Sequence, residues 1–196
     1  MKKSIFYLLF GVVLILSGCG EDEGSEGGEV STTSATQGWH FQGRDCLACH
    51  NVDLAEERHL LFGGSVYKDA NIINQDDINN SCGGELLVKF LDTTTGDTLY
   101  NSKDYKAVNS PGYNAKGNIF ILQRELRLLS AGAYYIQITD TNGTIMAASG
   151  AHQFTSQDYD IHNPVDFNNR LSCNSCHIKG GIQSPLYIQV NKNLCK

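Results

Sequence analysis

The sequence is short of positive charge and of long apolar runs. Its 15 Lys and Arg residues are outnumbered by 21 Asp and Glu residues, and the net charge of −6 argues against a protein that tracks nucleic-acid phosphates. The apolar run Ile5–Leu16 is too short for a comfortable bilayer span, which needs about 20 residues. With 41% apolar and 18% charged residues, the chain is neither a disordered polyelectrolyte nor a multi-pass membrane protein, and we expect it to fold.

The N-terminus has the pattern of an export signal, because Lys2 and Lys3 precede the apolar run. The run ends in Leu16-Ser17-Gly18-Cys19, which resembles the lipobox of bacterial lipoproteins. This resemblance implies removal of residues 1–18 and acylation of Cys19, while an uncleaved anchor is the alternative. Gly20, rather than Asp, follows Cys19, and by resemblance to Gram-negative sorting rules this permits transport to the outer membrane. We therefore expect a protein anchored by lipid in the bacterial cell envelope.

Residues 19–38 are expected to form a flexible tether. From Gly20 to Gly38 the chain has five acidic residues, no Lys or Arg, and otherwise mostly Gly, Ser and Thr. Such a composition cannot bury enough apolar surface to order itself.

Two pentapeptides, 122 residues apart, hold four of the seven cysteines. They are Cys46-Leu47-Ala48-Cys49-His50 and Cys173-Asn174-Ser175-Cys176-His177. This spacing lets two thiols form thioethers with one porphyrin while the adjacent histidine reaches the iron. Both resemble c-type haem attachment motifs, which implies two covalently bound haems with His50 and His177 as iron ligands. A thioredoxin-like dithiol, a zinc site and plain disulfides are the alternatives.

Histidine is the expected second iron ligand. Apart from Met1, the only methionine is Met146, so at most one haem of the mature chain could have His/Met ligation. Met146 falls in an expected strand, where a core role suits it better.

Four histidines lie outside the motifs, and we predict that His59 and His152 are the distal ligands. Asp53 and Glu56 have the spacing of a capping box, which predicts a short helix before His59. His152 is expected just after a strand that ends near Ser149. We rank His162 next and His40 last, since His40 borders the tether, and the sequence leaves open which distal histidine serves which haem.

Between the two motifs the apolar residues alternate with a period of two, which predicts strands. An Asp140-Thr141-Asn142-Gly143 turn predicts a hairpin. The expected strands are Phe62–Lys68, Leu86–Asp92, Asp97–Tyr100, Asn118–Leu122, Tyr134–Thr139, Thr144–Ser149 and Leu186–Val190, enough for a β-sandwich. The segment Arg124–Leu129 fits a strand less well, and Leu122, Leu126 and Leu129 could equally mark a short helix.

The pattern of Phe62–Asp69, Leu86–Asp92, Gly117–Phe120 and Ser130–Ile136 resembles the carboxypeptidase-regulatory or transthyretin-like sandwich. The whole mature chain resembles a small dihaem cytochrome lipoprotein. The resemblance implies a mainly β protein with an Ig/transthyretin-like β-sandwich at 61–150. Short helical or irregular haem-binding segments would flank it at 39–60 and 151–196.

Cys82 and Cys195 are the two thiols left unassigned, and in an exported protein an even remainder predicts a disulfide. Two six-coordinate haems leave no open iron site, so we expect an electron carrier of low potential rather than an enzyme. Its partners would be other redox proteins, and self-assembly of copies stays open. One alternative is a haem enzyme or ligand sensor with one open iron, and another is a β-sandwich docking module that carries haems.

Overall fold

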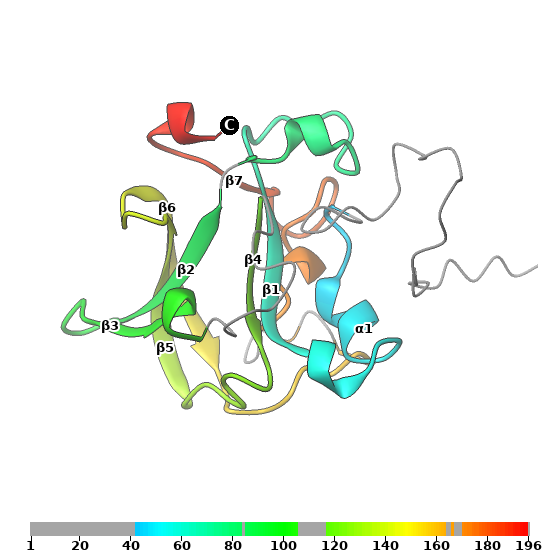
Figure 1. Ribbon diagram of the computed structural model, residues 1–196, viewed down its shortest axis with the longest axis vertical. Coiled ribbons are helices and arrows are strands. Elements are labelled where there is room, and N and C mark those ends of the chain that lie inside the picture. Colours follow the sequence, from blue (N-terminus) through cyan, green and yellow to red (C-terminus); the bar gives the residue numbers. More distant parts are fainter. Residues whose placement is uncertain (1–41, 84, 106–116, 164–165, 167–169, 196) are drawn as a thin grey trace, which may run out of the picture.

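A computed structural model describes residues 42–83, 85–105, 117–163, 166 and 170–195 (Figure 1). The tether, Cys19 and His40 lie outside the described residues. The chain order of elements is α1 (Cys46–His50), η1 (Glu56–Arg58), β1 (Leu60–Tyr67), η2 (Ile78–Asn80), β2 (Leu86–Asp92), β3 (Thr98–Asn101), η3 (Ser102–Tyr105), β4 (Asn118–Leu122), β5 (Gly132–Asp140), β6 (Ile145–Phe154), η4 (Cys173–Ser175), β7 (Leu186–Tyr187) and η5 (Lys192–Leu194), where η marks a 3₁₀ helix.

The strands form two sheets, so the expectation of a mainly β protein is confirmed. One sheet has the order β4-β1-β7 and the other β3-β2-β5-β6. Strand β1 pairs antiparallel with β4 and parallel with β7, whereas the second sheet is antiparallel throughout. Figure 1 shows β1 between the second sheet on one side and α1 on the other.

The core lies between the sheets and is organised around Phe90. Its ring packs edge-on against Phe62 at a centroid distance of 4.9 Å, and against Phe154 at 5.8 Å. Tyr134 completes the cluster at 6.1 Å from Phe90. All four side chains are buried, and edge-to-face aromatic contacts of this kind stabilise beyond the area they bury. Every residue of β1 is buried, because its outer side is covered as well.

Two local expectations are wrong. Strand β6 does not end near Ser149 but continues to Phe154, since His152 pairs with Tyr134 of β5; His152 therefore lies in the strand and not after it. The capping box at Asp53 does not form either. A short helical turn does precede His59, as expected, but it is the 3₁₀ helix η1, which begins at Glu56 and whose N-cap residue Ala55 makes no side-chain bond.

The segment after β4 contains no helix among its described residues. A turn follows Leu122, the chain is irregular from Leu126 to Ser130, and Leu129 is buried in the core. The helical alternative for this segment is therefore wrong.

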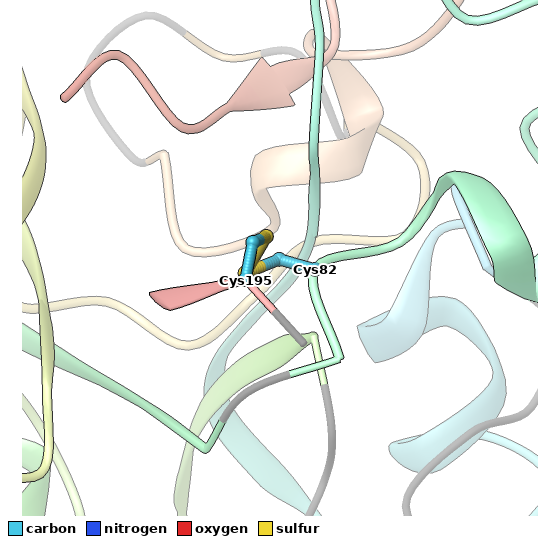
Figure 2. Close-up of a disulfide and its surroundings, with 2 residues drawn as sticks. All are labelled: Cys82 and Cys195. Atoms are coloured by element: carbon cyan, nitrogen blue, oxygen red, sulfur yellow. A yellow bond between two sulfur atoms is a disulfide. The ribbon is translucent and has the colours of Figure 1, made fainter. Parts of the chain in front are cut away.

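The C-terminal segment closes one end of the sandwich. After β7 the chain crosses to the second sheet, where the Gln189 and Val190 amides donate to the Met146 carbonyl of β6 at 2.9 and 3.1 Å. Cys195 then forms a disulfide with Cys82, as Figure 2 shows. The bond ties the end of the chain to the segment between β1 and β2.

Within the described ranges, no helix has the length and apolar character needed to cross a bilayer.

Candidate functional site

The two Cys-x-x-Cys-His motifs lie next to each other against strand β1. Helix α1 holds the first motif and η4 begins the second, and both cover the outer side of β1 (Figure 1). Two consecutive glycines permit this approach. A Cβ atom at Gly63 would lie 3.3 Å from the Cβ of Cys46, and one at Gly64 would lie 2.6 Å from the Cβ of Cys173. The two motifs, more than a hundred residues apart in sequence, thus lie together in the folded chain.

Buried polar contacts hold the second motif on the strand. The Gly63 amide donates to the Leu171 carbonyl at 3.1 Å. Within the motif, Asn174 is buried; its side-chain oxygen accepts from the Ser65 amide at 3.1 Å, and its nitrogen donates to the Arg44 carbonyl at 2.7 Å. Because buried amides are costly to leave unpaired, these bonds fix the position of η4.

A cavity of about 440 Å³ opens between the second motif, β6 and the segment leading into β7. Its volume is within the range of small-molecule and cofactor sites. Ile136, Ile138 and Ala147 form an apolar wall, and Arg170 is the one formally charged residue among the described residues of the lining. Both thiols of the second motif, its histidine and one further histidine complete the lining: Cys173, Cys176, His177 and His152.

His177 and His152 each bond a backbone carbonyl through Nδ1 and so keep Nε2 available to a metal. The Nδ1 atom of His177 lies 2.9 Å from the Ser184 carbonyl oxygen, and that of His152 lies 2.9 Å from the Gly150 carbonyl oxygen. A carbonyl only accepts, so each Nδ1 carries the proton and donates it, and each Nε2 keeps its lone pair. This second bond is the usual way in which proteins orient a ligating imidazole. Burial lowers the pKa of both rings and so favours the neutral, ligating form.

The centroid distance between these two rings is compatible with a metal held between them. Their centroids are 6.5 Å apart and their planes differ by 34°. With a metal–nitrogen bond of about 2.0 Å and a centroid roughly 1.1 Å behind each nitrogen, two imidazoles on opposite sides of one metal have centroids roughly 6.2 Å apart. The donor set therefore fits a haem in this cavity, with thiols, proximal imidazole and distal imidazole all present.

The first motif is built in a similar way around His50. Its Nδ1 donates to the Arg58 carbonyl at 2.8 Å, and burial lowers its pKa. The neighbouring His59 is near enough to contribute to that shift. However, His59 uses Nε2 to donate to the Leu54 carbonyl at 3.1 Å, so its lone pair is on Nδ1. Its tautomer is thus the opposite of that of His152.

Burial keeps the three free thiols of the two motifs protonated. It raises the pKa of Cys46 to about 12 and that of Cys173 further still, and it also raises that of Cys176. A reactive dithiol needs a lowered pKa instead. Cys46, Cys173 and Cys176 are free thiols, whereas Cys49 is disulfide-bonded. A thioether at Cys49 therefore requires that bond to open first.

The remaining predicted residues are distributed as follows. His162 is exposed in a turn where its amide donates to Asp160 at 2.8 Å, and it does not line the cavity. Sequence reasoning missed Asp45, Arg170 and the Ser184 carbonyl, none of which carries a motif signal. Among the residues that the structure describes, no group of three or more His, Cys, Asp or Glu side chains could hold a bare metal ion.

The chain was compared with protein-family models, curated proteins and solved structures. None of them matches it.

Proposed function

We propose that this chain is an exported, lipid-anchored dihaem c-type cytochrome that transfers electrons. The observation that carries the proposal is the cavity lined by Cys173, Cys176, His177 and His152, in which the ring centroids of the two histidines are 6.5 Å apart. A bound haem would supply a one-electron redox centre. The order of elements is compatible with an Ig/transthyretin-like sandwich, which is the finer fold type that we propose.

The attachment residues would be Cys46 and Cys49 in the first motif and Cys173 and Cys176 in the second. Each of the three free thiols, Cys46, Cys173 and Cys176, would add across one vinyl group: the sulfur bonds one carbon, its hydrogen goes to the other carbon, and no oxidant or reductant is consumed. Cys49 is disulfide-bonded, so an external dithiol would first have to reduce that bond, becoming a disulfide itself, before the Cys49 thiol could add in the same way. The raised pKa values of Cys46, Cys173 and Cys176 keep these three thiols in the protonated form that this addition starts from.

His50 and His177 would bind the iron from the attachment side. His152 would occupy the other side of the second site, and His59 is proposed for the first. The carbonyls of Gly150 and Ser184 hold the second pair of rings in one tautomer and one orientation. With both sides occupied by imidazole there is no open position for a substrate, which favours a carrier of low potential.

The anchor and the partners belong to the same proposal. Acylated Cys19 would hold the domain at the envelope membrane, with the outer membrane favoured, and residues 19–38 would let it reach other redox proteins. Arg170 supplies positive charge to the cavity lining, which suits a carboxylate-bearing cofactor.

The test is production of the chain in a bacterial host that matures c-type cytochromes. Expected are a mass increase of two haems that survives denaturation and a pyridine haemochrome spectrum of thioether-linked haem. His177→Ala and His152→Ala should each change the spectrum of one haem only, whereas the matched control His162→Ala should leave both unchanged. A colourless protein from a competent host would overturn the proposal.

A second candidate, a haem enzyme or ligand sensor, is favoured by one observation at the first motif. Because His59 donates from Nε2 to the Leu54 carbonyl, the iron side opposite His50 would be open if that bond persists. Carbon monoxide binding to the reduced protein separates the candidates. Rapid binding at one haem supports the sensor or enzyme, and no binding supports the carrier.

A further inference from the structure

A single carboxylate, that of Asp45, lies between the two attachment motifs. Asp45 is the N-cap residue of α1, where its Oδ1 accepts from the Ala48 amide at 3.2 Å. The equivalent residue before the second motif is Ser172, the N-cap residue of η4, which makes no side-chain capping bond in its own helix. Instead its hydroxyl donates to the same Oδ1 of Asp45 at 2.5 Å. The N-cap residue of the second motif, Ser172, therefore hydrogen-bonds to the N-cap residue of the first, Asp45.

The other oxygen of Asp45 also accepts from the second half of the chain. Ser175, within the second motif, donates to Oδ2 at 2.9 Å, and the Tyr159 hydroxyl donates to the same atom. Burial and the nearby Asp45 charge raise the pKa of Tyr159, so its hydroxyl stays protonated and remains a donor. Three of the four donors thus come from residues 114 to 130 positions away, and bonds to a charged acceptor are stronger than neutral ones.

The first cysteines of the two motifs flank this contact. Cys46 directly follows Asp45, and Cys173 directly follows Ser172. The Asn174 side chain, between the two cysteines of the second motif, reaches to 3.7 Å from the Cys46 sulfur. Gly63 and Gly64 seat the two first cysteines at consecutive positions of β1.

We infer that Asp45 is a positioning residue that locks the two attachment motifs together, so that the two haems form one rigid, directly coupled pair. The inference rests on the proposed function for its cofactors, although the lock itself concerns only this chain's residues. Asp45 would not touch the iron; it would act through the placement of Cys46 and Cys173.

The test compares two changes at Asp45. Asp45→Ala removes the acceptor and opens the lock. Asp45→Asn removes the charge but keeps Oδ1 as an acceptor, and the Ser175 and Tyr159 hydroxyls can rotate to accept from its amide. Asp77→Ala is the matched control, because Asp77 caps a short helix through the Asn79 amide at 2.9 Å and makes no bond to either motif. Should Asp45→Ala fail to fold, Ser172→Ala/Ser175→Ala opens the lock from the other side.

The first measurement is the exciton couplet in the Soret circular dichroism of the dihaem protein, which depends on the mutual placement of two haems. Asp45→Ala and the double serine variant should each lower its amplitude at least twofold with both haems still attached. Asp45→Asn and Asp77→Ala should keep it. Asp45→Asn should also raise the redox midpoints, because a negative charge that favours the oxidised iron is gone.

Three results would overturn the inference: a wild-type protein without a couplet, a couplet unchanged in Asp45→Ala, or an equal loss in Asp45→Asn. The second measurement, amide hydrogen exchange of the haem-free chain, keeps the lock testable by itself. Exchange at 172–177 should be at least tenfold faster in Asp45→Ala and unchanged in Asp77→Ala. If no variant attaches haem, the proposed function fails while the exchange data still decide the lock.

Discussion

Removal of the Cys82–Cys195 disulfide should destabilise this domain more than any single side-chain truncation. The bond joins residues 113 apart in sequence, so it closes a long loop of the unfolded chain. In the chain-entropy account such a loop corresponds to about 5 kcal/mol of stability at 25 °C. That is a large part of the 5–15 kcal/mol by which domains of this size are usually stable. Cys82 is fully buried, so the alanine variant also loses packing.

The assay is urea unfolding of the haem-free chain, followed by tyrosine fluorescence. With a slope of about 2 kcal/mol per molar urea, Cys82→Ala/Cys195→Ala should unfold at a midpoint lower by roughly 2.5 M. Cys176→Ala, which removes a free thiol, is the control for loss of a cysteine. A midpoint within 0.5 M (about 1 kcal/mol) of the wild type would refute the reasoning, since the loop would then be constrained equally without the bond.

Three further outcomes test the packing and the charges. Gly64→Ala would place a Cβ 2.6 Å from the Cβ of the first cysteine of the second motif. It should therefore destabilise the chain by about 1–3 kcal/mol in unfolding measurements and, in mass measurements, prevent haem attachment at that motif only. Gly150→Ala is the control, because the new Cβ there has open space around it. Phe90→Ala should lower the free energy of unfolding by about 3–5 kcal/mol, because this buried ring contacts both sheets, and a loss below 1 kcal/mol would contradict the placement of the core. The Arg127 guanidinium holds the pKa of Asp158 below its usual 3.8, so the pair stabilises the fold fully above pH 3.8 and loses this effect as the pH falls below it. Both side chains are more than half exposed. Urea unfolding at pH 7 should therefore show that Asp158→Asn lowers the free energy of unfolding by less than about 1 kcal/mol, and unfolding at pH 2 should show no difference from the wild type.

Regular alternation made most strands predictable from the sequence. Strands β2 and β4 have the expected bounds, Leu86–Asp92 and Asn118–Leu122. The extension of β6 was not predictable, because Gly150 and Ala151 interrupt the alternation and only pairing with β5 continues the strand. The local sequence pattern therefore predicts strand bounds where apolar and polar side chains alternate, and it fails where pairing with a neighbouring strand determines the bounds.

Some features of the candidate site could likewise be predicted from the sequence, and others could not. The four motif cysteines and the two motif histidines follow from spacing alone, and an even number of leftover thiols predicted Cys82–Cys195. The Ser184 and Gly150 carbonyls could not be predicted, because every residue has a carbonyl and only the fold aims these two at imidazoles. The contact of Asp45 with Ser172 joins residues 127 apart, a distance over which a single sequence carries no pairing information.

The parallel pairing of β1 with β7 has a consequence for biogenesis. Val66 and Leu186 are partners, so the first sheet cannot be completed until almost the whole polypeptide has been synthesised. The segment before β7 also supplies the carbonyl that orients His177. The first motif is therefore made while the sheet is still incomplete, and the cavity beside the second motif closes last.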